Sequence, residues 1–283
     1  MNTLPPLETL FDAQHGTGMP LPAELAALYG QLRFPLQPSR PYVFANFVAS
    51  LDGVVSLEAP GRAGGGDISG NNKHDHMVMG ILRAIADSII VGAGTLRKSP
   101  RHIWTAEHIY SPFTSLYQQL RHSLGKSEPP LNVIVTREGN TDMNQRLFQS
   151  GAVPVLIITT KEGEQRVRRQ TIPSSTRIIA IEPTGEGDLS AQAILEVVQR
   201  TRPSDLILTE GGPQLLATFF AEYCLDELFL TLAPQVAGRD ETIKRPGLVA
   251  GKLFAPEFPL WGSLVSVKRE TNHLFLRYSF ASR

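Results

Sequence analysis

The sequence lacks the residues on which several common classes of protein depend. It contains one cysteine, Cys224, among 283 residues, so it can form no intrachain disulfide and no paired-cysteine metal site. A lone cysteine is more often a small buried side chain than a nucleophile, and both interpretations stay open. His74 and His76 lie two residues apart and point in different directions on a helix. We therefore expect polar surface positions for both histidines, and no metal site.

Excess charge and long apolar runs are also missing. Lys and Arg together number 27, as do Asp and Glu, so the formal net charge is zero. This balance argues against nucleic acid or an anionic membrane surface as a partner. The longest apolar runs have the length of a strand, and the chain does not open with a basic segment followed by an apolar core. We therefore expect a cytoplasmic protein with no membrane-spanning segment.

The familiar signatures of nucleotide binding and hydrolysis are absent as well. Gly92-Ala93-Gly94 lacks the third glycine of the dinucleotide fingerprint, and Lys98 is misplaced for a phosphate-binding P-loop. The sequence contains no nucleophile elbow and no zinc-deaminase signature. If a nucleotide binds, we expect it to bind in a different manner from that of the usual Rossmann fold.

What the chain does contain, from Pro41 onward, is an alternation of short apolar runs and amphipathic segments. The alternation predicts an α/β fold with a mostly parallel central sheet, helices on both faces and a C-terminal antiparallel hairpin. The expected strands are Tyr42–Val48, Val54–Leu57, Ser88–Val91, Leu131–Thr136, Val155–Thr159, Arg177–Ile181, Leu206–Thr209, Glu227–Leu232, Gly262–Lys268 and His273–Ser279. The expected helices are Ala23–Leu32, Asn71–Ala86, Pro112–Ser123, Lys161–Gln170, Leu189–Thr201 and Pro213–Glu222. Residues 1–40 are rich in proline, so we expect an arm with one short helix, packed on a single domain of residues 41–283.

Three short turns follow expected strands, at Ser50–Gly53, Gly92–Thr95 and Glu210–Pro213. The carboxyl ends of parallel strands meet in a crevice where ligands bind. Glycines before a helix start let the backbone approach a ligand and leave N–H groups for a phosphate. An ordinary tight turn explains each motif equally well when it is taken alone. Arg83 is more unusual, because it stands among apolar residues of an expected helix and must reach solvent, a carboxylate or an anionic ligand.

Six motifs then occur in one order along the chain. They are ASLDG at 49–53, ISG at 68–70, LRAIAD at 82–87, VGAGT at 91–95, TEGGP at 209–213 and LDELFLTLAP at 225–234. Together they resemble the stand-alone branch of the pyrimidine reductases of riboflavin biosynthesis, the family of 5-amino-6-(5-phosphoribosylamino)uracil reductase and the bacterial RibD C-terminal domain. The resemblance implies a dihydrofolate-reductase-like fold, NADPH as cofactor, and hydride transfer to the ribose C1′ of a phosphoribosylamino-pyrimidine. It also implies a homodimer.

The resemblance implies roles for individual residues. Arg83 matches the family's arginine for the substrate phosphate, Glu210 matches the acidic residue that reads the substrate ring, and Gly65 lies in the substrate loop. No residue is assigned as catalytic, because hydride transfer needs no covalent nucleophile. Contacts with NADPH are implied for Val48, Ala49, Ser50, Thr95, Arg137, Gly211, Gly212, Pro213, Gln214 and Leu215, with Arg137 suited to the 2′-phosphate.

Two segments depart from the family pattern. Residues Gly65–Asp67 stand where a serine or tryptophan is often found, and the run Leu96–Ile103 lacks the aspartate that usually precedes the proline. In the family these positions touch the substrate or the nicotinamide. Two alternatives therefore stay open: a reductase of another pteridine or pyrimidine such as dihydrofolate, and a nucleotide-binding module without catalytic activity.

Overall fold

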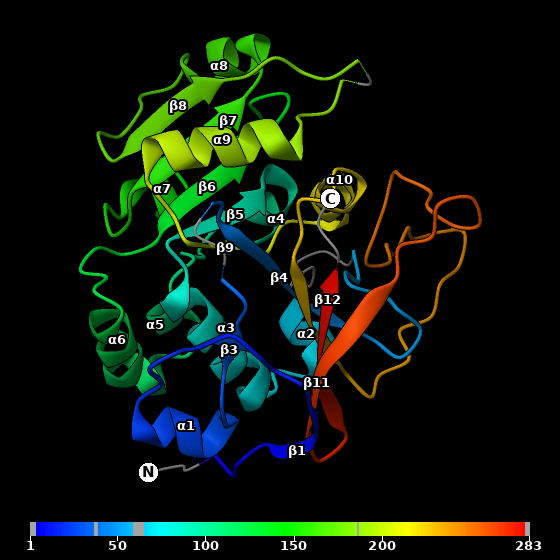
Figure 1. Cartoon of the computed structure of the whole chain (residues 1–283). Helices are drawn as coiled ribbons and strands as arrows, with labels where there is room; N and C mark the ends of the chain where they lie inside the picture. Colours follow the sequence, from blue (N-terminus) through cyan, green and yellow to red (C-terminus); the bar gives the residue numbers. More distant parts are fainter. Residues whose placement is uncertain (1–3, 37–38, 59–64, 186, 281–283) are drawn as a thin grey trace.

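A ten-stranded mixed sheet runs through the molecule in the order β1-β11-β12-β10-β4-β9-β5-β6-β7-β8, and β2 and β3 form a separate pair (Figure 1). The computed structural model describes residues 4–36, 39–58, 65–185 and 187–280. The strands are β1 (Glu8–Asp12), β2 (Thr17–Gly18), β3 (Arg33–Phe34), β4 (Tyr42–Ala49), β5 (Ser88–Gly92), β6 (Leu131–Val135), β7 (Val155–Thr159), β8 (Thr176–Ala180), β9 (Leu206–Thr209), β10 (Glu227–Leu232), β11 (Gly262–Glu270) and β12 (His273–Phe280).

Helices connect these strands. They are α1 (Ala23–Tyr29), α2 (Gly65–Ser69), α3 (Lys73–Ile85), α4 (Ala93–Lys98), α5 (Ala106–Ile109), η1 (Ser111–Phe113), α6 (Thr114–Ser123), α7 (Arg146–Gln149), α8 (Lys161–Val167), α9 (Ala191–Thr201) and α10 (Pro213–Ala221). None of the helices in the described ranges is both long and apolar enough to cross a membrane.

Side chains along the strands alternate between two apolar cores. Phe44 of β4 packs in the core that contains side chains of α1, α3 and α6, whereas Val43 and Ala45 pack in the core of α9 and α10. Parallel strands need this arrangement, because both faces of such a sheet must be covered. The predicted α/β class is therefore confirmed, with a mostly parallel sheet, helices on both faces and an antiparallel β11–β12 hairpin.

The strand order places a crevice between β5 and β9. These two strands are parallel neighbours. After β5 the chain continues to β6, which lies on the side of β5 away from β9. After β9 it continues to β10, which lies in the opposite direction, beyond β4. Where neighbouring strands connect in opposite directions, their carboxyl ends leave a crevice that binds ligands. The turns Gly92–Thr95 and Glu210–Pro213 both lie at this switch point.

The structure changes the prediction for the N-terminal arm. Residues Glu8–Asp12 pair antiparallel with β11, so part of the arm forms one edge of the main sheet. All five residues of β1 are exposed, so the strand shows no alternation of buried and exposed side chains that the sequence could reveal. The short helix expected in the arm is present as α1.

Two smaller predictions are wrong. Residues Val54–Leu57 form no strand, because the Val54 N–H bonds to the Ser50 hydroxyl at 2.9 Å and the backbone is used in a turn held by Asp52. His74 is not a surface residue: it is buried, and its Nε2 lies 2.8 Å from the carbonyl oxygen of Pro5. The strand was predicted because residues 54, 55 and 57 are apolar, as in a strand. His74 can be buried because its ring has a backbone hydrogen-bond partner.

A buried ion pair ties the arm to the sheet. The Arg277 guanidinium of β12 pairs with Glu227 of β10, and its Nη2 donates to the carbonyl oxygen of Arg33 at 3.0 Å. The same guanidinium lies 5.3 Å from the ring centroid of Phe34 and 4.6 Å from that of Phe229. One cation thus joins two central strands and the arm.

We expect Arg277→Leu to lower the free energy of unfolding by about 3–5 kcal/mol, because it leaves Glu227 buried without its partner. The side chains of Arg277 and Glu227 are 2% and 1% exposed, whereas those of Arg269 and Glu8 are 47% and 54% exposed. The matched control Arg269→Leu should therefore cost less than about 1 kcal/mol. Urea denaturation measures both values, and equal losses would contradict the structural role of Arg277.

Candidate active site

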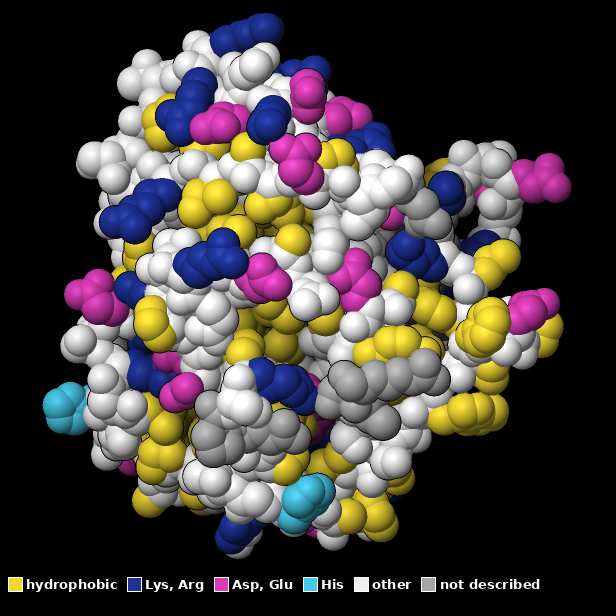
Figure 2. Space-filling view, turned by 45° about the horizontal axis from the view of Figure 1, so that its top comes forward, with side chains coloured by type: hydrophobic (Ala, Val, Ile, Leu, Met, Phe, Trp, Pro, Cys, Tyr) yellow, Lys and Arg dark blue, Asp and Glu magenta, His cyan; other side chains and the backbone are white. Residues whose placement is uncertain are grey.

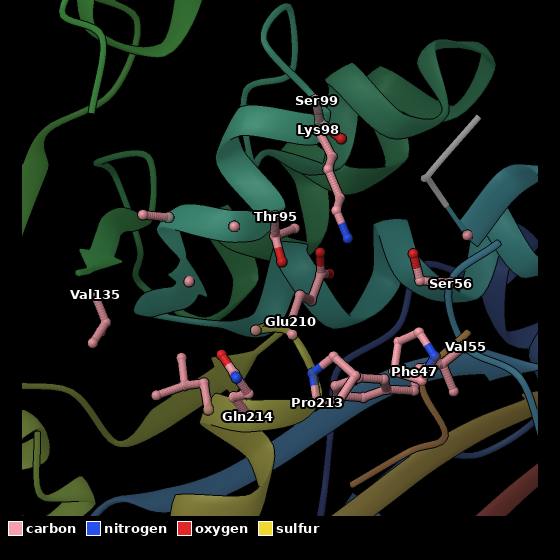
Figure 3. Close-up of a pocket in the computed structure, with 18 of the residues that line it drawn as sticks. Phe47, Val55, Ser56, Thr95, Lys98, Ser99, Val135, Glu210, Pro213 and Gln214 are labelled. Carbon is pink, nitrogen blue, oxygen red and sulfur yellow. The ribbon is translucent and has the colours of Figure 1, made fainter. Parts of the chain in front are cut away.

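A cleft of about 1000 Å³ opens at the carboxyl ends of β4, β5, β6 and β9 (Figure 3). In the close-up, Thr95 of α4 lies on one wall, Pro213 and Gln214 of α10 lie on the opposite wall, and Glu210 stands between them. Val135 marks one end of this view and Ser56 the other. The volume is at the upper end of the range for ligand pockets, so it has room for an extended ligand.

One half of the cleft is suited to phosphate groups. Helix α10 begins with Pro213, its N-cap residue is Gly212, and no side chain caps its first N–H groups. A Cβ built on Gly212 would lie 3.6 Å from the Thr95 hydroxyl, and one on Gly92 would lie 3.9 Å from the Gly212 nitrogen. The two glycine turns therefore face each other across a space that side chains leave free. Uncapped N–H groups at a helix start bind anions, so a nucleotide diphosphate fits here.

Two cationic side chains, Arg137 and Lys252, line the nucleotide half of the cleft. Arg137 follows β6, its side chain is 56% exposed, and its Nη2 lies 3.5 Å from Glu138 Oε1. Lys252 also lines the cleft, where its Nζ lies 3.9 Å from Asp188 Oδ2. An exposed ion pair at such distances contributes little, so Arg137 can exchange Glu138 for a phosphate at low cost.

The other half of the cleft contains a buried ion pair. Arg83 of α3 donates from Nε to Glu210 Oε1 at 2.9 Å and from Nη2 to Glu210 Oε2 at 2.6 Å. The two side chains are 2% and 8% exposed. The sequence left solvent, a carboxylate and an anionic ligand open as partners of Arg83. The structure shows a carboxylate, which explains how Arg83 can stand among apolar residues. Two of the three residues expected to bind the substrate thus bind each other.

His102 fixes the remaining side of this guanidinium. Arg83 Nη1 donates to His102 Nε2 at 2.9 Å and to the carbonyl oxygen of Thr105 at 3.2 Å. Burial, and secondarily the charge of Arg83, lower the pKa of His102 to about 2, so the ring is neutral and accepts this bond. Among the described residues, four of the five N–H groups of Arg83 therefore have partners, and the second N–H of Nη2 has none.

The comparisons with known proteins agree with this architecture. The model of the RibD C-terminal domain family matches residues 41–256. The chain belongs to this family. A curated relative, the 2,5-diamino-6-ribosylamino-4(3H)-pyrimidinone 5′-phosphate reductase of Archaeoglobus fulgidus, is 27% identical over 203 residues, which are 71% of this chain and 84% of that protein.

Solved structures share the fold of this RibD-family chain. A diaminohydroxyphosphoribosylaminopyrimidine deaminase/5-amino-6-(5-phosphoribosylamino)uracil reductase of Thermotoga maritima matches with a TM-score of 0.62 and 20% identity, over 86% of this chain and 57% of that chain. The chain thus spans little more than half of that two-activity protein. A pyrimidine reductase-like protein of Corynebacterium diphtheriae matches with a TM-score of 0.62 and 22% identity, over 86% of this chain and 93% of that one. At these identities the likeness shows the fold.

Most residues expected from the family lie together in the cleft. The lining includes Val48, Gly65, Arg83, Thr95, Arg137, Glu210, Gly211, Gly212, Pro213, Gln214 and Leu215. Ala49 and Ser50 are not among the lining residues in the described part of the chain, and the Ser50 hydroxyl instead donates to Asp52 at 2.6 Å. A Cβ on Gly65 would lie 2.7 Å from Val48 Cγ1, so a larger residue there would have to displace Val48.

The sequence did not identify several other residues of the cleft. Asp75, His76 and Met79 line it beside Arg83, all on one face of α3. Met79 lies three or four residues from Asp75, His76 and Arg83, and this spacing is the signal that could have grouped them. His102 gave no such signal, because it reaches Arg83 from a loop after α4.

We expect Gly212→Val to weaken NADPH binding about tenfold to a hundredfold, because its side chain would fill the space between the two glycine turns. A lost hydrogen bond to a charged group is worth roughly 1.5–3 kcal/mol. Fluorescence titration measures the affinity. Gly185→Ala is the control, because no atom lies within 4 Å of a Cβ there, and it should bind NADPH normally. If Gly212→Val binds NADPH as tightly as the wild type does, the phosphate does not bind at this turn.

Proposed function

We propose that this RibD-family chain is an NADPH-dependent reductase of riboflavin biosynthesis, which reduces C1′ of a ring-opened phosphoribosylamino-pyrimidine to a ribityl chain. Family membership and the name of the archaeal relative support a reductase of this kind. The observation that carries the proposal is one cleft in which a helix start suited to phosphate adjoins a buried arginine–carboxylate pair. A dinucleotide and an anionic ring compound can thus meet in it.

NADPH fits the nucleotide half described above. The N–H groups at the start of α10 would hold its pyrophosphate, Thr95 would bond to it from the facing turn, and Arg137 would bind the 2′-phosphate. Val48 of β4 would place the nicotinamide next to the substrate. When bound, the cofactor supplies a hydride, and the chain supplies orientation, charge and exclusion of water.

Arg83 and Glu210 would bind the substrate as a unit. Each carboxylate oxygen of Glu210 accepts one bond from Arg83 and retains a lone pair for an N–H group of the pyrimidine. The free Nη2 N–H of Arg83 would donate to the substrate phosphate. Lys98 extends into the cavity, where it pairs with Glu58, and it would add a second positive charge for that phosphate (Figure 3).

We expect Arg83→Ala to raise the KM for the substrate about a hundredfold or more while the affinity for NADPH stays within about twofold, because a buried charge pair broken on one side costs several kcal/mol. Arg83→Lys keeps the charge but cannot form the two-pronged bond, so its KM should lie between the two. Steady-state kinetics and NADPH titration measure these values. A parallel loss of NADPH affinity in both variants would contradict the assignment.

One assay separates the candidate functions. Oxidation of NADPH, and separately of NADH, is followed by absorbance. Each cofactor is tested with three substrates: the deaminated phosphoribosylamino-pyrimidine, its 2,5-diamino counterpart and dihydrofolate. Turnover of a phosphoribosylamino-pyrimidine with NADPH supports the proposal. Turnover of dihydrofolate alone would make the chain a different reductase, and NADPH binding without any turnover would make it a binding module. Arg137→Ala should reduce the preference for NADPH over NADH, because only NADPH carries the 2′-phosphate.

A cytoplasmic homodimer completes the proposal. β1 leaves one edge of the main sheet uncovered, and Leu10 and Phe11 on it are 49% and 43% exposed. A second copy could cover this edge. On the face shown in Figure 2, acidic and basic side chains are interspersed. Light scattering of the purified chain measures its mass in solution, and a monomer would contradict this part.

A further inference from the structure

Asp75 is a buried carboxyl group with no part yet in the proposed reaction. It lies in the first turn of α3, is 3% exposed and lines the cleft. Its carboxyl group interacts with the hydroxyls of Thr231 and Ser69. Thr231 stands opposite Val48 in the β10–β4 pairing. Asp75 therefore lies at the end of the cleft where the nicotinamide and C1′ would meet.

Asp75 differs from the other carboxyl groups that line the cleft. In the described part of the chain, Glu210 pairs with Arg83, Glu58 with Lys98, Glu138 with Arg137 and Asp188 with Lys252. Asp75 forms no ion pair with a lysine or arginine among the described residues, and the hydroxyls with which it interacts are uncharged. A carboxyl group in such a site is more stable with its proton than without it.

The charged and titratable groups around Asp75 act in both directions. Burial raises the pKa of Asp75 above its ordinary value and is the largest effect. The hydroxyls of Thr231 and Ser69 lower it, as do His76 on α3 and His273 on β12. Burial in turn lowers the pKa of His76, so that ring supplies little positive charge near neutral pH. Glu270 of β11 bonds to Asn72, next to α3, and adds no positive charge.

We propose that Asp75 is the catalytic acid of this reductase, giving its proton to the imine nitrogen of the ring-opened substrate while C1′ is reduced. This inference rests on the proposed function. The new C–H bond at C1′ would form with the hydride that bound NADPH supplies, and the electron pair of the C=N bond would move to nitrogen. The nitrogen takes the proton as the O–H bond of Asp75 breaks, leaving a carboxylate, a secondary amine and the oxidised nicotinamide. Water in the cleft then returns the proton to Asp75.

Other groups near the substrate cannot supply this proton. Glu210 is the carboxylate of an ion pair and only accepts hydrogen bonds. The pKa of His102 is lowered to about 2, so it carries no extra proton at neutral pH. Arg83 does not release its protons in water. Asp75 is thus the carboxyl group of the described cleft that can hold a proton and deliver it.

Asp75→Asn tests the proposal, because the amide has nearly the same size and shape as the carboxyl group but carries no acidic proton. The single-turnover rate of hydride transfer should fall about 10²–10⁴-fold while the affinity for NADPH is unchanged. In the wild type this rate should be high at low pH and decrease as pH rises through the folded-state pKa of Asp75. The Asn variant should show no such decrease. Asp75→Glu should recover part of the rate together with its pH dependence.

Asp142→Asn is the matched control, because Asp142 is exposed and outside the cleft, and it should behave as wild type. A wild-type rate or an unchanged pH profile in Asp75→Asn would overturn the role of Asp75 alone. Absence of wild-type turnover on every candidate substrate would instead overturn the proposed function, and the acid role with it. The two failures are thus distinguishable.

Unfolding measurements report the proton of Asp75 without any substrate. A raised folded-state pKa means that the folded chain keeps a proton which the unfolded chain releases above about 3.8. The quantity to compare is the folding equilibrium constant of the wild type divided by that of Asp75→Asn. This ratio should fall about tenfold for each pH unit between about pH 3.8 and the folded-state pKa of Asp75, and it should be constant above that pKa. Urea denaturation at several pH values shows this divergence, and parallel curves for the two proteins would overturn the proposal.

Discussion

The ion pair between Arg83 and Glu210 is the constraint that organises the cleft. It joins helix α3 to the turn that follows β9, and both side chains are almost entirely buried. Neither charge would be stable there without the other, so the helix and the turn must meet at one position. Glu210 is followed directly by Gly211 and Gly212, which precede the helix start suited to phosphate. The pair therefore fixes the distance between the substrate half and the nucleotide half.

The two halves differ in their electrostatics, and the difference matches their proposed tasks. The nucleotide half offers backbone N–H groups and an exposed Arg137, which can bind a charged cofactor and release it at modest cost. The substrate half has a paired charge, a neutral His102 and a buried Asp75. A hydrogen bond in such surroundings is stronger than in water, so orientation and proton donation belong there.

The sequence predicted those features that depend on local pattern. Apolar runs revealed the parallel strands, and Arg83 in an apolar helix face had to reach solvent, a carboxylate or an anionic ligand. Strand β1 was missed because its side chains are all exposed, and Val54–Leu57 was wrong because a side-chain-held turn uses the backbone there. Asp75 escaped notice for another reason. Its partner Thr231 lies on a strand far along the chain, and only the β10–β4 pairing brings that hydroxyl to the start of α3.

The segment that departs from the family pattern has a part in the same network. His102 and Thr105 come from the region after α4, and both accept hydrogen bonds from Nη1 of Arg83. With that side engaged, the guanidinium cannot turn away from Glu210, so an anionic ligand must approach Nη2. The segment after α4 therefore helps to fix the direction from which an anionic ligand reaches Arg83.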